Sequence, residues 1–470
     1  MKKNYNIAIV GLGQIGGYLY NELRNKKKDI EKKTGKKINI VAISAKNINK
    51  KRKYKINKKI FFKNPLDIFK YNIDILFECI GLSGGISKTI VKKALNNGIH
   101  VITPNKALIS DCGDELSKIA ERHKVNLEFE ASVGGGIPIL RTIKEGLATN
   151  KINKVYGILN GTCNYILSEM EKTKEDFKSV LKKAQSLGYA EPGNPKLDLN
   201  GYDALAKVKI LSALSFNRKI SKNYPLMEGI ESIESKDFNI ADQLNLRIKL
   251  LGITEIINNN LFERVHPCLV KKESYIGNVN GVMNAVILDG QPIGQSVLQG
   301  EGAGPGPTSS ALMSDLLSVL RGNIKFPFGI SSSKRSKVNI YDVNQYINSL
   351  YIRFEVKDKP GVLSQITKQL AKYKISIQRL IQIPDNIRKK ASIIIITHNV
   401  KEYYSNKCIK SFGKNKNIIK KLYCNQVILM DIYIKLFEVV FPSFLCCWNS
   451  ATTLGKTNPK IDTKFNYKFC

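Results

Sequence analysis

The stretch "DLNGYDALAK", residues 198 to 207, places two aspartates and a lysine within ten residues. Asp203 and Lys207 are four residues apart, so they share one face if the segment is helical. Charged groups seldom lie in a protein interior unless they are paired or have a chemical task, such as proton transfer. A salt bridge on a helix surface, worth less than ~1 kcal/mol, is the simpler alternative.

The elements around this cluster would have to position it. Asp198 and Glu191 precede the helical segment that would carry Asp203 and Lys207, in a loop rich in Pro and Gly. Another lysine, Lys106, comes directly after a predicted strand at 99–103, and ligands bind at the carboxyl ends of strands in open α/β sheets. The segment 202–214 is predicted to be a helix with an apolar stripe formed by Ala204, Val208, Leu211 and Leu214.

A glycine-rich loop near the start of the chain predicts a dinucleotide site. In "NIAIVGLGQIGGYLYNELRN" (6–25), an apolar strand leads into a GxGxxG loop and then into an amphipathic helix. Gly11 permits a tight turn, Gly13 lets the backbone approach a pyrophosphate, and Gly16 allows helix and strand to pack closely. The helix N-terminus then holds the phosphates. The candidate cofactor-binding residues of this loop are Gly11, Leu12, Gly13, Gln14, Ile15 and Gly16.

The second strand, 38–44, indicates which dinucleotide is preferred. It runs into Ser44-Ala45-Lys46 instead of ending in an acid, and a missing acid beside a cation suits a 2′-phosphate. We therefore expect NADP(H) to be preferred, with NAD(H) possible, and Lys46 to bind the cofactor. Further strands at 73–81, 99–103 and 125–131, with a helix at 86–97, predict a mostly parallel, doubly wound Rossmann-like sheet.

Two longer motifs show a resemblance to a known family. "GILNGTCNYIL" (157–167) and "AQSLGYAEPGNPKLDLNGYDALAKVKILSALSF" (184–216), together with the glycine loop, Lys106 and "EASVGGGIP" (130–138), resemble homoserine dehydrogenase. The resemblance extends from about residue 5 to about residue 400. The family's pattern is matched by Ala184, Gly188, Pro195, Asp198, Gly201, Asp203 and Lys207.

The resemblance implies NAD(P)-dependent interconversion of L-aspartate 4-semialdehyde and L-homoserine, within threonine, methionine and isoleucine biosynthesis. Lys207 matches the family's general acid/base, and Lys106 matches a second lysine that holds the substrate and polarises its carbonyl. Two nearby cations are expected to depress each other's pKa, which would help one to donate a proton near neutral pH. Glu191 and Asp203 match positions that bind the substrate's amino group, and Asp198 supports them.

The resemblance also implies a structural sodium ion and further cofactor contacts. Glu130 and the carbonyls of Val133, Gly135 and Ile137 would surround the ion, whereas a plain glycine turn is the alternative. No zinc is implied, because the four histidines are scattered and no Cys/His ligand spacing exists. Gly188 is a further candidate cofactor contact.

The segment 300–320 is a glycine loop before a predicted helix that Thr308 and Ser309 could cap. In the family this segment returns to the cofactor domain, so Gly302 is a candidate cofactor neighbour.

The C-terminal part resembles an ACT domain, a small amino-acid-sensing module. Residues 350–384 predict strand, loop, helix and strand, and 391–398 a further strand, with 425–434 as a possible last strand. The turn 358–361 leads into the first helix, where ligands usually bind, and threonine is the family's usual effector.

The expected organisation is a Rossmann domain (1–135), an α+β catalytic and dimerisation domain (136–325), an ACT-like βαββαβ domain (345–430) and an atypical tail (431–470). Segment 300–320 is expected to pack back on the cofactor domain. A homodimer or homotetramer is expected.

Composition excludes some other classes. The net charge of +36 comes mainly from lysines spread along the chain with Asn and Ile, so no nucleic-acid partner is expected. The run 46–59 is a possible edge for an anionic ligand, although a solvated loop is the simpler interpretation. Nine cysteines without paired spacing indicate a reduced, cytoplasmic protein, and charges and a proline interrupt the apolar tract 431–448, so no membrane span is expected.

Two rival functions remain open from the sequence. One rival is another NADP oxidoreductase that acts on an amino-acid semialdehyde, with aspartate-semialdehyde dehydrogenase as the obvious example. That enzyme would need a nucleophilic thiol and a His base, and Cys163 is the only plausible thiol, while no His is well placed by sequence. An amino-acid-sensing regulator without catalysis is the second rival, but the intact glycine loop, Lys106 and Lys207 argue against it.

Overall fold

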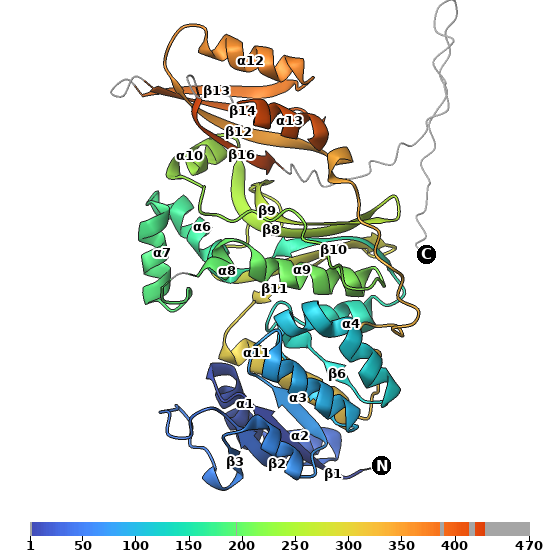
Figure 1. Ribbon diagram of the computed structural model, residues 1–470. Coiled ribbons are helices and arrows are strands. Elements are labelled where there is room, and N and C mark those ends of the chain that lie inside the picture. The colour runs from blue at the N-terminus through green and yellow to red at the C-terminus, as the bar shows by residue number, and fades with distance from the viewer. Residues whose placement is uncertain (1, 194, 386–389, 413–418, 428–470) are drawn as a thin grey trace, which may run out of the picture. The chain divides into compact units, whose positions relative to one another are not determined.

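A parallel six-stranded sheet forms the first part of the chain in the computed structural model, which describes residues 2–193, 195–385, 390–412 and 419–427 (Figure 1). Its strands lie in the order β3-β2-β1-β4-β5-β6, so the direction of winding reverses between β1 and β4. Ligands bind at such a switch point, outside the carboxyl ends of the strands. The strands are β1 (Asn4–Val10), β2 (Lys37–Ser44), β3 (Phe61–Phe62), β4 (Ile75–Glu78), β5 (His100–Ile102) and β6 (Leu127–Glu128). The predicted doubly wound sheet is confirmed.

Helices cover this sheet, and one of them comes from much later in the chain. α11 (Pro305–Leu320) packs against α1 (Gln14–Asn25), and Leu312 and Leu316 share an apolar cluster with Leu19. Gly304 precedes α11 without a side-chain cap, and Thr308 and Ser309 lie buried inside the helix, so their predicted capping role is wrong. The other helices here are α2 (Lys27–Thr34), η1 (Lys58–Ile60), η2 (Pro65–Lys70), α3 (Gly85–Asn96) and α4 (Lys106–Arg122).

A second, mixed sheet runs through the rest of the described chain in the order β11-β10-β7-β8-β9-β16-β12-β14-β13. Its first five strands are β7 (Lys151–Ile158), β8 (Leu246–Ile257), β9 (Asn260–Lys271), β10 (Met283–Gln291) and β11 (Gly294–Glu301). The helices of this part are η3 (Glu130–Ser132), α5 (Ile139–Arg141), η4 (Thr142–Gly146), α6 (Gly161–Thr173), α7 (Phe177–Ser186), α8 (Lys196–Leu199), α9 (Tyr202–Ser215) and α10 (Ser235–Gln243). The predicted helix at 202–214 is therefore confirmed as α9.

The C-terminal part has the predicted βαββαβ order. Its elements are η5 (Val343–Gln345), β12 (Ile347–Lys357), α12 (Val362–Lys372), β13 (Ile377–Asp385), β14 (Lys390–Thr397), β15 (Val400–Lys401), α13 (Glu402–Phe412) and β16 (Ile419–Val427). The last strand was expected to begin at residue 425, but β16 begins at Ile419. Its hydrogen-bonded ladder follows β12 from Val356 to Ser349. Residues 428–434 of that prediction, and the tail 431–470, lie outside the described residues.

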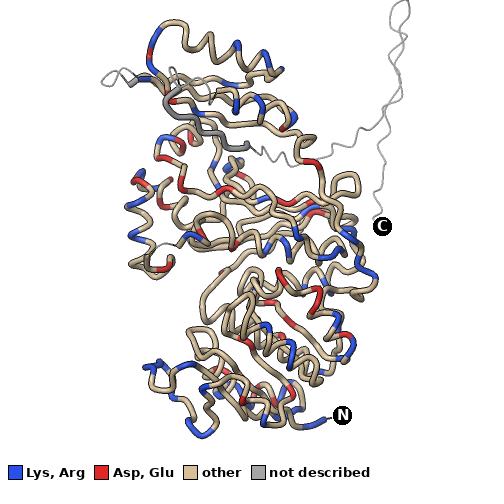
Figure 2. The backbone as a smooth tube through the Cα atoms, viewed as in Figure 1, with Lys and Arg blue, Asp and Glu red and all other residues tan. Residues whose placement is uncertain are grey.

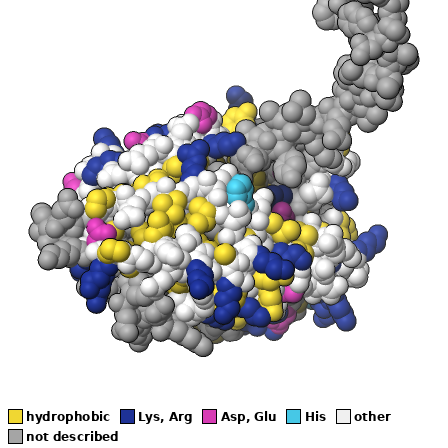
Figure 3. Space-filling view, turned by 90° about the horizontal axis from the view of Figure 1, so that it is seen from above, with side chains coloured by type: hydrophobic (Ala, Val, Ile, Leu, Met, Phe, Trp, Pro, Cys, Tyr) yellow, Lys and Arg dark blue, Asp and Glu magenta, His cyan; other side chains and the backbone are white. Residues whose placement is uncertain are grey.

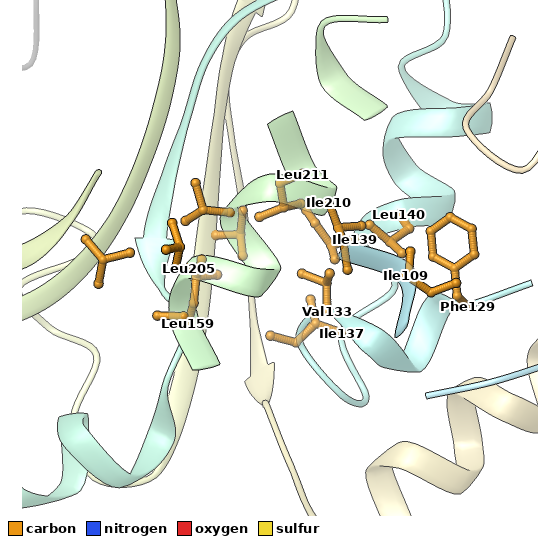
Figure 4. Packing of buried hydrophobic residues seen from close by; sticks show 14 of the residues in the cluster. Ile109, Phe129, Val133, Ile137, Ile139, Leu140, Leu159, Leu205, Ile210 and Leu211 are labelled. Atoms are coloured by element: carbon orange, nitrogen blue, oxygen red, sulfur yellow. The ribbon is translucent and has the colours of Figure 1, made fainter. Parts of the chain in front are cut away.

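The first two parts share one apolar core. Figure 4 shows one cluster that runs from Leu205 of α9, next to Leu159, through Ile210 and Leu211 of α9 to Ile109 of α4 and to Phe129, which leads into η3. All six side chains are buried. Because close-packed interiors transmit position, this contact fixes α4 and α9 relative to each other.

A buried ionic cluster joins β12 to α10. Nε and Nη2 of Arg353 lie 2.8 and 3.2 Å from the two carboxylate oxygens of Asp237. The hydroxyl of Tyr351 donates to Asp237 at 2.7 Å, and Glu234 and Glu355 also contact the guanidinium. Arg353 is fully buried.

Among the described residues, no helix is long and apolar enough to cross a membrane.

Candidate active site

Asp203 lies between the two lysines that the sequence singled out. Its Oδ1 is 2.7 Å from Nζ of Lys106, and its Oδ2 is 2.8 Å from Nζ of Lys207. Lys106 is the first residue of α4, at the carboxyl edge of the parallel sheet, and the other two residues lie in the first turns of α9. The site therefore forms where the cofactor-type sheet meets the second part of the chain.

Lys207 is a buried residue, so the alternative of a surface salt bridge is wrong. Only 7% of it is exposed, because the apolar stripe of α9 packs into the core and turns this face inward. Its Nζ donates to the carbonyl of Leu159 at 2.6 Å and to Asp203. An ammonium group has three protons, so one donor position remains for a substrate.

Asn160 organises the two aspartates and was not identified from the sequence. Its Nδ2 donates to Oδ1 of Asp198 at 2.9 Å and to Oδ2 of Asp203 at 3.1 Å. Its Oδ1 caps α6 by accepting from the backbone N–H of Cys163 at 2.8 Å. The available signal was an Asn at a strand-to-helix junction, a preferred capping residue. Asp198 itself lies in the short helix α8, not in a loop as expected.

The charges at the site differ from the expectation in one respect. Burial alone would raise the pKa of Asp203, but the ammonium groups of Lys207 and Lys106 hold it well below its usual range. Burial lowers the pKa of Lys106, but Asp203, Asp198 and Glu191 outweigh this and raise it overall. The expected mutual depression of the two lysines is therefore wrong for Lys106, because a carboxylate sits between the cations.

Asp198 and Glu191 differ in their surroundings. Burial, followed by the charge of Asp203, raises the pKa of Asp198. Glu191 is exposed in the loop after α7, and its charge acts on Lys106. Its backbone carbonyl accepts from Nε2 of Gln185 at 3.1 Å, which ties the loop to α7. Nearby, Gly188 has a φ of +76°, as a glycine at the end of a helix commonly does.

The glycine loop has the packing that a dinucleotide site requires. Gly11 has a φ of +90°, and a Cβ there would lie 2.5 Å from the backbone of Cys79. A Cβ at Gly16 would lie 2.0 Å from the carbonyl oxygen of Gly11, so helix and strand are in close contact. A Cβ at Gly13 would meet nothing within 4 Å, which leaves the backbone open to a ligand.

A cavity of about 690 Å³ lies over this loop. It is lined by Leu12, Gly13, Gln14, Gly17, Tyr18, Pro305, Gly306 and the run Lys50 to Tyr54. Figure 2 shows Lys and Arg along the connection between β2 and β3, which includes this run. Arg52 donates to the carbonyls of Asn47, Ile48 and Lys50 and to that of Leu12. It therefore ties the connection between β2 and β3 to the glycine loop. Lys46 is exposed and is not among the lining residues.

The loop 130–138 fits a cation only in part. Both carboxylate oxygens of Glu130 accept backbone N–H groups, from Leu140 and Arg141, at 2.8 Å. The carbonyl of Ile137 accepts from Ile139 at 2.8 Å. Across the described ranges, the carbonyls of Val133 and Gly135 accept no backbone hydrogen bond.

Carbonyl oxygens, not side chains, are therefore the ligands that the loop 130–138 could offer a cation. Nor do three His, Cys, Asp or Glu side chains group to hold a metal in the part of the chain that the structure describes.

Gly302 lies between the loop 130–138 and Asn284 of β10. A Cβ at Gly302 would lie 2.0 Å from Nδ2 of Asn284, and a Cβ at Gly135 would lie 2.6 Å from the carbonyl carbon of Gly302. Only glycine fits at position 135, where φ is +53° and the clash is with backbone, whereas a side chain at position 302 would have to displace the side chain of Asn284. The segment before α11 is thus in contact with the loop 130–138.

Cys163 lacks the features of a catalytic nucleophile. It is fully buried, and its Sγ contacts the carbonyl of Asp198 at 3.3 Å. Burial, with the charges of Asp198 and Asp203, raises the pKa of its thiol well above the ordinary value. A thiol in such surroundings stays protonated, which argues against the aspartate-semialdehyde dehydrogenase alternative.

A Rossmann sheet, a lysine–carboxylate cluster at its carboxyl edge and a βαββαβ module are typical of a dehydrogenase that carries a C-terminal ACT-like module. Comparison with known proteins supports this class. Residues 11–130 match the homoserine dehydrogenase NAD-binding domain, 138–317 match homoserine dehydrogenase, and 350–402 match the ACT domain.

The relatives agree along most of the chain. The homoserine dehydrogenase of Neisseria gonorrhoeae is 37% identical over 407 residues, 85% of this chain and 93% of the relative. That of Pseudomonas aeruginosa is 36% identical, over 87% and 95%. The crystal structure of a homoserine dehydrogenase from Thiobacillus denitrificans is 33% identical, with a TM-score of 0.82 and coverage of 92% and 99%. The chain belongs to the homoserine dehydrogenase family and is an oxidoreductase.

Proposed function

We propose that Lys207 and Lys106 carry the interconversion of L-aspartate 4-semialdehyde and L-homoserine in this chain. The observation that supports these roles most strongly is the placement of Asp203 between the two lysines at the carboxyl edge of the sheet. A bound nicotinamide cofactor supplies or accepts the hydride. The residues of the chain bind the substrate, orient it and move the proton.

Lys207 is the proton donor in the reducing direction and the acceptor in the other. Two of its ammonium protons are engaged by Leu159 and Asp203, and the third is directed to the substrate oxygen. The burial of Lys207 excludes competing water, which strengthens this interaction. The role of Lys106 is different: it is a charged group among the carboxylates of Asp203, Asp198 and Glu191, and it polarises the carbonyl oxygen of the substrate.

The substrate's ammonium group binds to Glu191 and Asp203, with Asp198 supporting them through Asn160. Oδ1 of Asp203 is engaged by Lys106 in this structure. The side chain of Lys106 is 42% exposed, so it is free to turn from Asp203 towards the carbonyl when the ammonium group takes its place. Exchange of one cation for another keeps the buried carboxylate paired throughout.

NADP(H) is the preferred cofactor. Gly11 to Gly16 and the N-terminus of α1 bind the pyrophosphate. No acid follows β2, and Lys46 stands there together with the basic residues that line the cavity over the glycine loop. Gly188 and Gly302 are further cofactor neighbours. A 2′-phosphate would be attracted to these cations, whereas NAD(H) would lack that interaction.

A sodium ion would be held by the carbonyls of Val133 and Gly135, which lack backbone partners in the described structure. Ile137 and Glu130 complete the loop around the ion. Its role is to hold the loop against Gly302, not to take part in the reaction.

Threonine is the proposed effector of the ACT-like domain. A cavity of about 480 Å³ is lined by residues 356–363, Gln382, Ala391 and Ile393. The turn 358–361 forms part of this lining, and Gly361 at the start of α12 has a φ of +84°. Feedback requires threonine to bind one conformation better than another. Calorimetry with threonine, and inhibition at subsaturating substrate, test the proposal; no binding and no inhibition would leave the domain structural.

The proposed assembly is a homodimer or homotetramer in the cytoplasm. β13 is an edge strand of the described sheet, and its Leu380 and Ile383 are exposed. Figure 3 shows apolar side chains on the face seen from above, between lysines and arginines. Exposed apolar patches of this kind mark interaction surfaces. Light scattering of the purified chain measures the assembly, and a monomer at all concentrations would contradict it.

The test of catalysis is an absorbance assay in both directions. Purified protein should oxidise NADPH with L-aspartate 4-semialdehyde and reduce NADP⁺ with L-homoserine. Absence of turnover in both directions would overturn the proposal. Inactivation by a thiol reagent that substrate prevents would instead favour chemistry at Cys163.

A further inference from the structure

Glu78 is a buried carboxylate that the proposed mechanism does not use. It is the last residue of β4 and is fully buried. Its Oε1 accepts from the backbone N–H groups of Ile80 at 2.9 Å and Gly81 at 3.3 Å, and from the hydroxyl of Ser87 at 3.0 Å. These three bonds fix the loop that follows β4 and the start of α3.

The second oxygen of Glu78 binds the segment that follows the neighbouring strand, β5. Oε2 accepts from the hydroxyl of Thr103 at 2.7 Å and from Nδ2 of Asn105 at 3.2 Å. All five donors to Glu78 are neutral. A buried carboxylate is tolerated with neutral partners only if its hydrogen bonds are made well, so the geometry around Glu78 is strongly determined.

Asn105 transmits this geometry to Lys106. Its Nδ2 also donates to the carbonyl of Leu82 at 2.8 Å, and its Oδ1 caps α4 by accepting from the backbone N–H of Leu108 at 3.1 Å. The amide cannot be reversed without losing both the Glu78 contact and the cap. Because Lys106 is the first residue of α4, its backbone follows Asn105 directly.

We propose that Glu78 is a positioning residue that couples the loop after β4 to Lys106. The loop 80–82 lies at the switch-point edge, where the cofactor binds in the proposed function on which this inference rests. Lys106 reaches Asp203 at 2.7 Å from the other end of the same network. The carboxylate of Glu78 thus fixes the position of the loop 80–82 relative to Lys106.

The test is Glu78→Gln, which keeps the size but puts an NH₂ group opposite neutral donors. Since small displacements of positioned groups cost up to about 100-fold in rate, we expect kcat/KM for L-homoserine to fall by about tenfold or more. The effect should appear mainly in kcat, and the dissociation constant for NADPH should change by less than about threefold. Thr103→Val, which removes one donor, should act in the same direction with a smaller effect.

A double-mutant cycle identifies the route of the effect. In a Lys106→Ala background, Glu78→Gln should lower kcat/KM by less than about twofold, because its partner is already gone. Equal losses in both backgrounds, or no loss in either, would overturn the proposal. The matched control is Asp114→Asn, also on α4. The carboxylate of Asp114 pairs with Arg335 at a distance of 2.6 Å and belongs to neither the Glu78 network nor the Lys106–Asp203–Lys207 cluster. This variant should keep kcat within about twofold of wild type.

A readout without turnover separates this proposal from the proposed function. The rate of amine acetylation at Lys106, resolved by peptide mass spectrometry, should change by more than about threefold in Glu78→Gln and remain constant in Asp114→Asn. An unchanged rate in Glu78→Gln would overturn the coupling. Inactive wild-type protein would count against the proposed function, and the labelling rates would still decide the role of Glu78. If Glu78→Gln does not fold, Thr103→Val is used in the double-mutant cycle. A loss of kcat/KM that disappears in the Lys106→Ala background supports the coupling, and equal losses in both backgrounds, or no loss in either, would overturn it.

Discussion

Two clusters of buried charge join the parts of this molecule, and they are built differently. At the candidate active site, Asp203 is contacted by Lys106 and Lys207, and Lys106 is partly open to solvent. At the junction with the ACT-like domain, Arg353 is fully buried and forms a bidentate contact with Asp237. The first cluster has a partner that can be exchanged and a proton position left over. In the second, Arg353 and Asp237 are both buried and contact each other directly, with Glu234 and Glu355 as further partners of the guanidinium.

The difference indicates which cluster serves chemistry. A group that transfers a proton needs an unfilled donor position, and the two hydrogen bonds of Lys207 leave one for the proposed substrate. A buried ion pair whose two members contact each other fixes the packing of two elements, which here are β12 and α10. Burial and opposite charge are common to both, so neither property alone identifies a catalytic group.

The largest effect is expected from Lys207→Ala. Loss of a positioned proton donor should lower kcat by about 10²–10⁴-fold. Affinity for NADPH, measured by fluorescence titration, should change little, because the proposed mechanism places Lys207 against the substrate and not against the cofactor. Activity near wild type would remove Lys207 from the mechanism.

Arg353→Ala should act on stability instead. Breaking a buried ion pair leaves Asp237 without its main partner and typically costs about 3–5 kcal/mol. Urea unfolding should show this loss, while kcat of the folded fraction stays within about twofold of wild type. A variant with normal stability and reduced kcat would invert the comparison between the two clusters.

Cofactor preference should respond to the basic residues over the glycine loop. Replacing Lys50, Lys51 and Lys53 by Ser should reduce the preference for NADPH over NADH by about tenfold, the worth of one charge-assisted hydrogen bond. Lys46→Glu should also narrow or reverse the preference. Ratios of kcat/KM for the two cofactors measure both effects.

Two other lysines of the same basic run provide the control for this prediction. Lys58 and Lys59 are absent from the residues that line the cavity over the glycine loop and, unlike Lys46, they do not follow the end of β2. Replacing both by Ser should leave the cofactor ratio unchanged. A wild-type enzyme that uses NADH better than NADPH would show that the interpretation of the β2 end is wrong.

The smallest effect concerns pH. The depressed pKa of Asp203 contributes stability that is fully present above the unfolded-state pKa, about 3.9, and is lost as pH falls through the folded-state value. The difference in unfolding free energy between wild type and Asp203→Asn should therefore be constant from about pH 5 to 8 and decrease below about pH 4. A difference that already declines near neutral pH would contradict the pairing with both lysines.

The sequence was informative where spacing along one element determines contact. Asp203 and Lys207 could be paired from their separation on a helix, and Lys106 could be placed from its position after a strand. The parallel sheet and the βαββαβ module were also predictable, because strand and helix patterns alternate in a recognisable order.

Contacts between distant segments could not be predicted. Asn160 and Glu78 bind partners that belong to other elements, and neither residue type at such a position identifies its partner. The same holds for Arg353, whose partner Asp237 is more than a hundred residues away. The direction of the Lys106 pKa was mistaken for the same reason: it depends on the carboxylate of Asp203 lying between two cations.

The most direct measurement compares Asp203→Asn with Asp237→Asn, two isosteric changes at buried carboxylates paired with cations. Turnover of L-homoserine per folded molecule is measured at a temperature where circular dichroism shows both variants folded. Asp203→Asn should lose at least about 100-fold in kcat/KM, and Asp237→Asn should stay within about twofold of wild type while losing stability. Equal losses in the two variants, or a turnover near wild type in Asp203→Asn, would contradict the assignment of the active site to the Lys106–Asp203–Lys207 cluster.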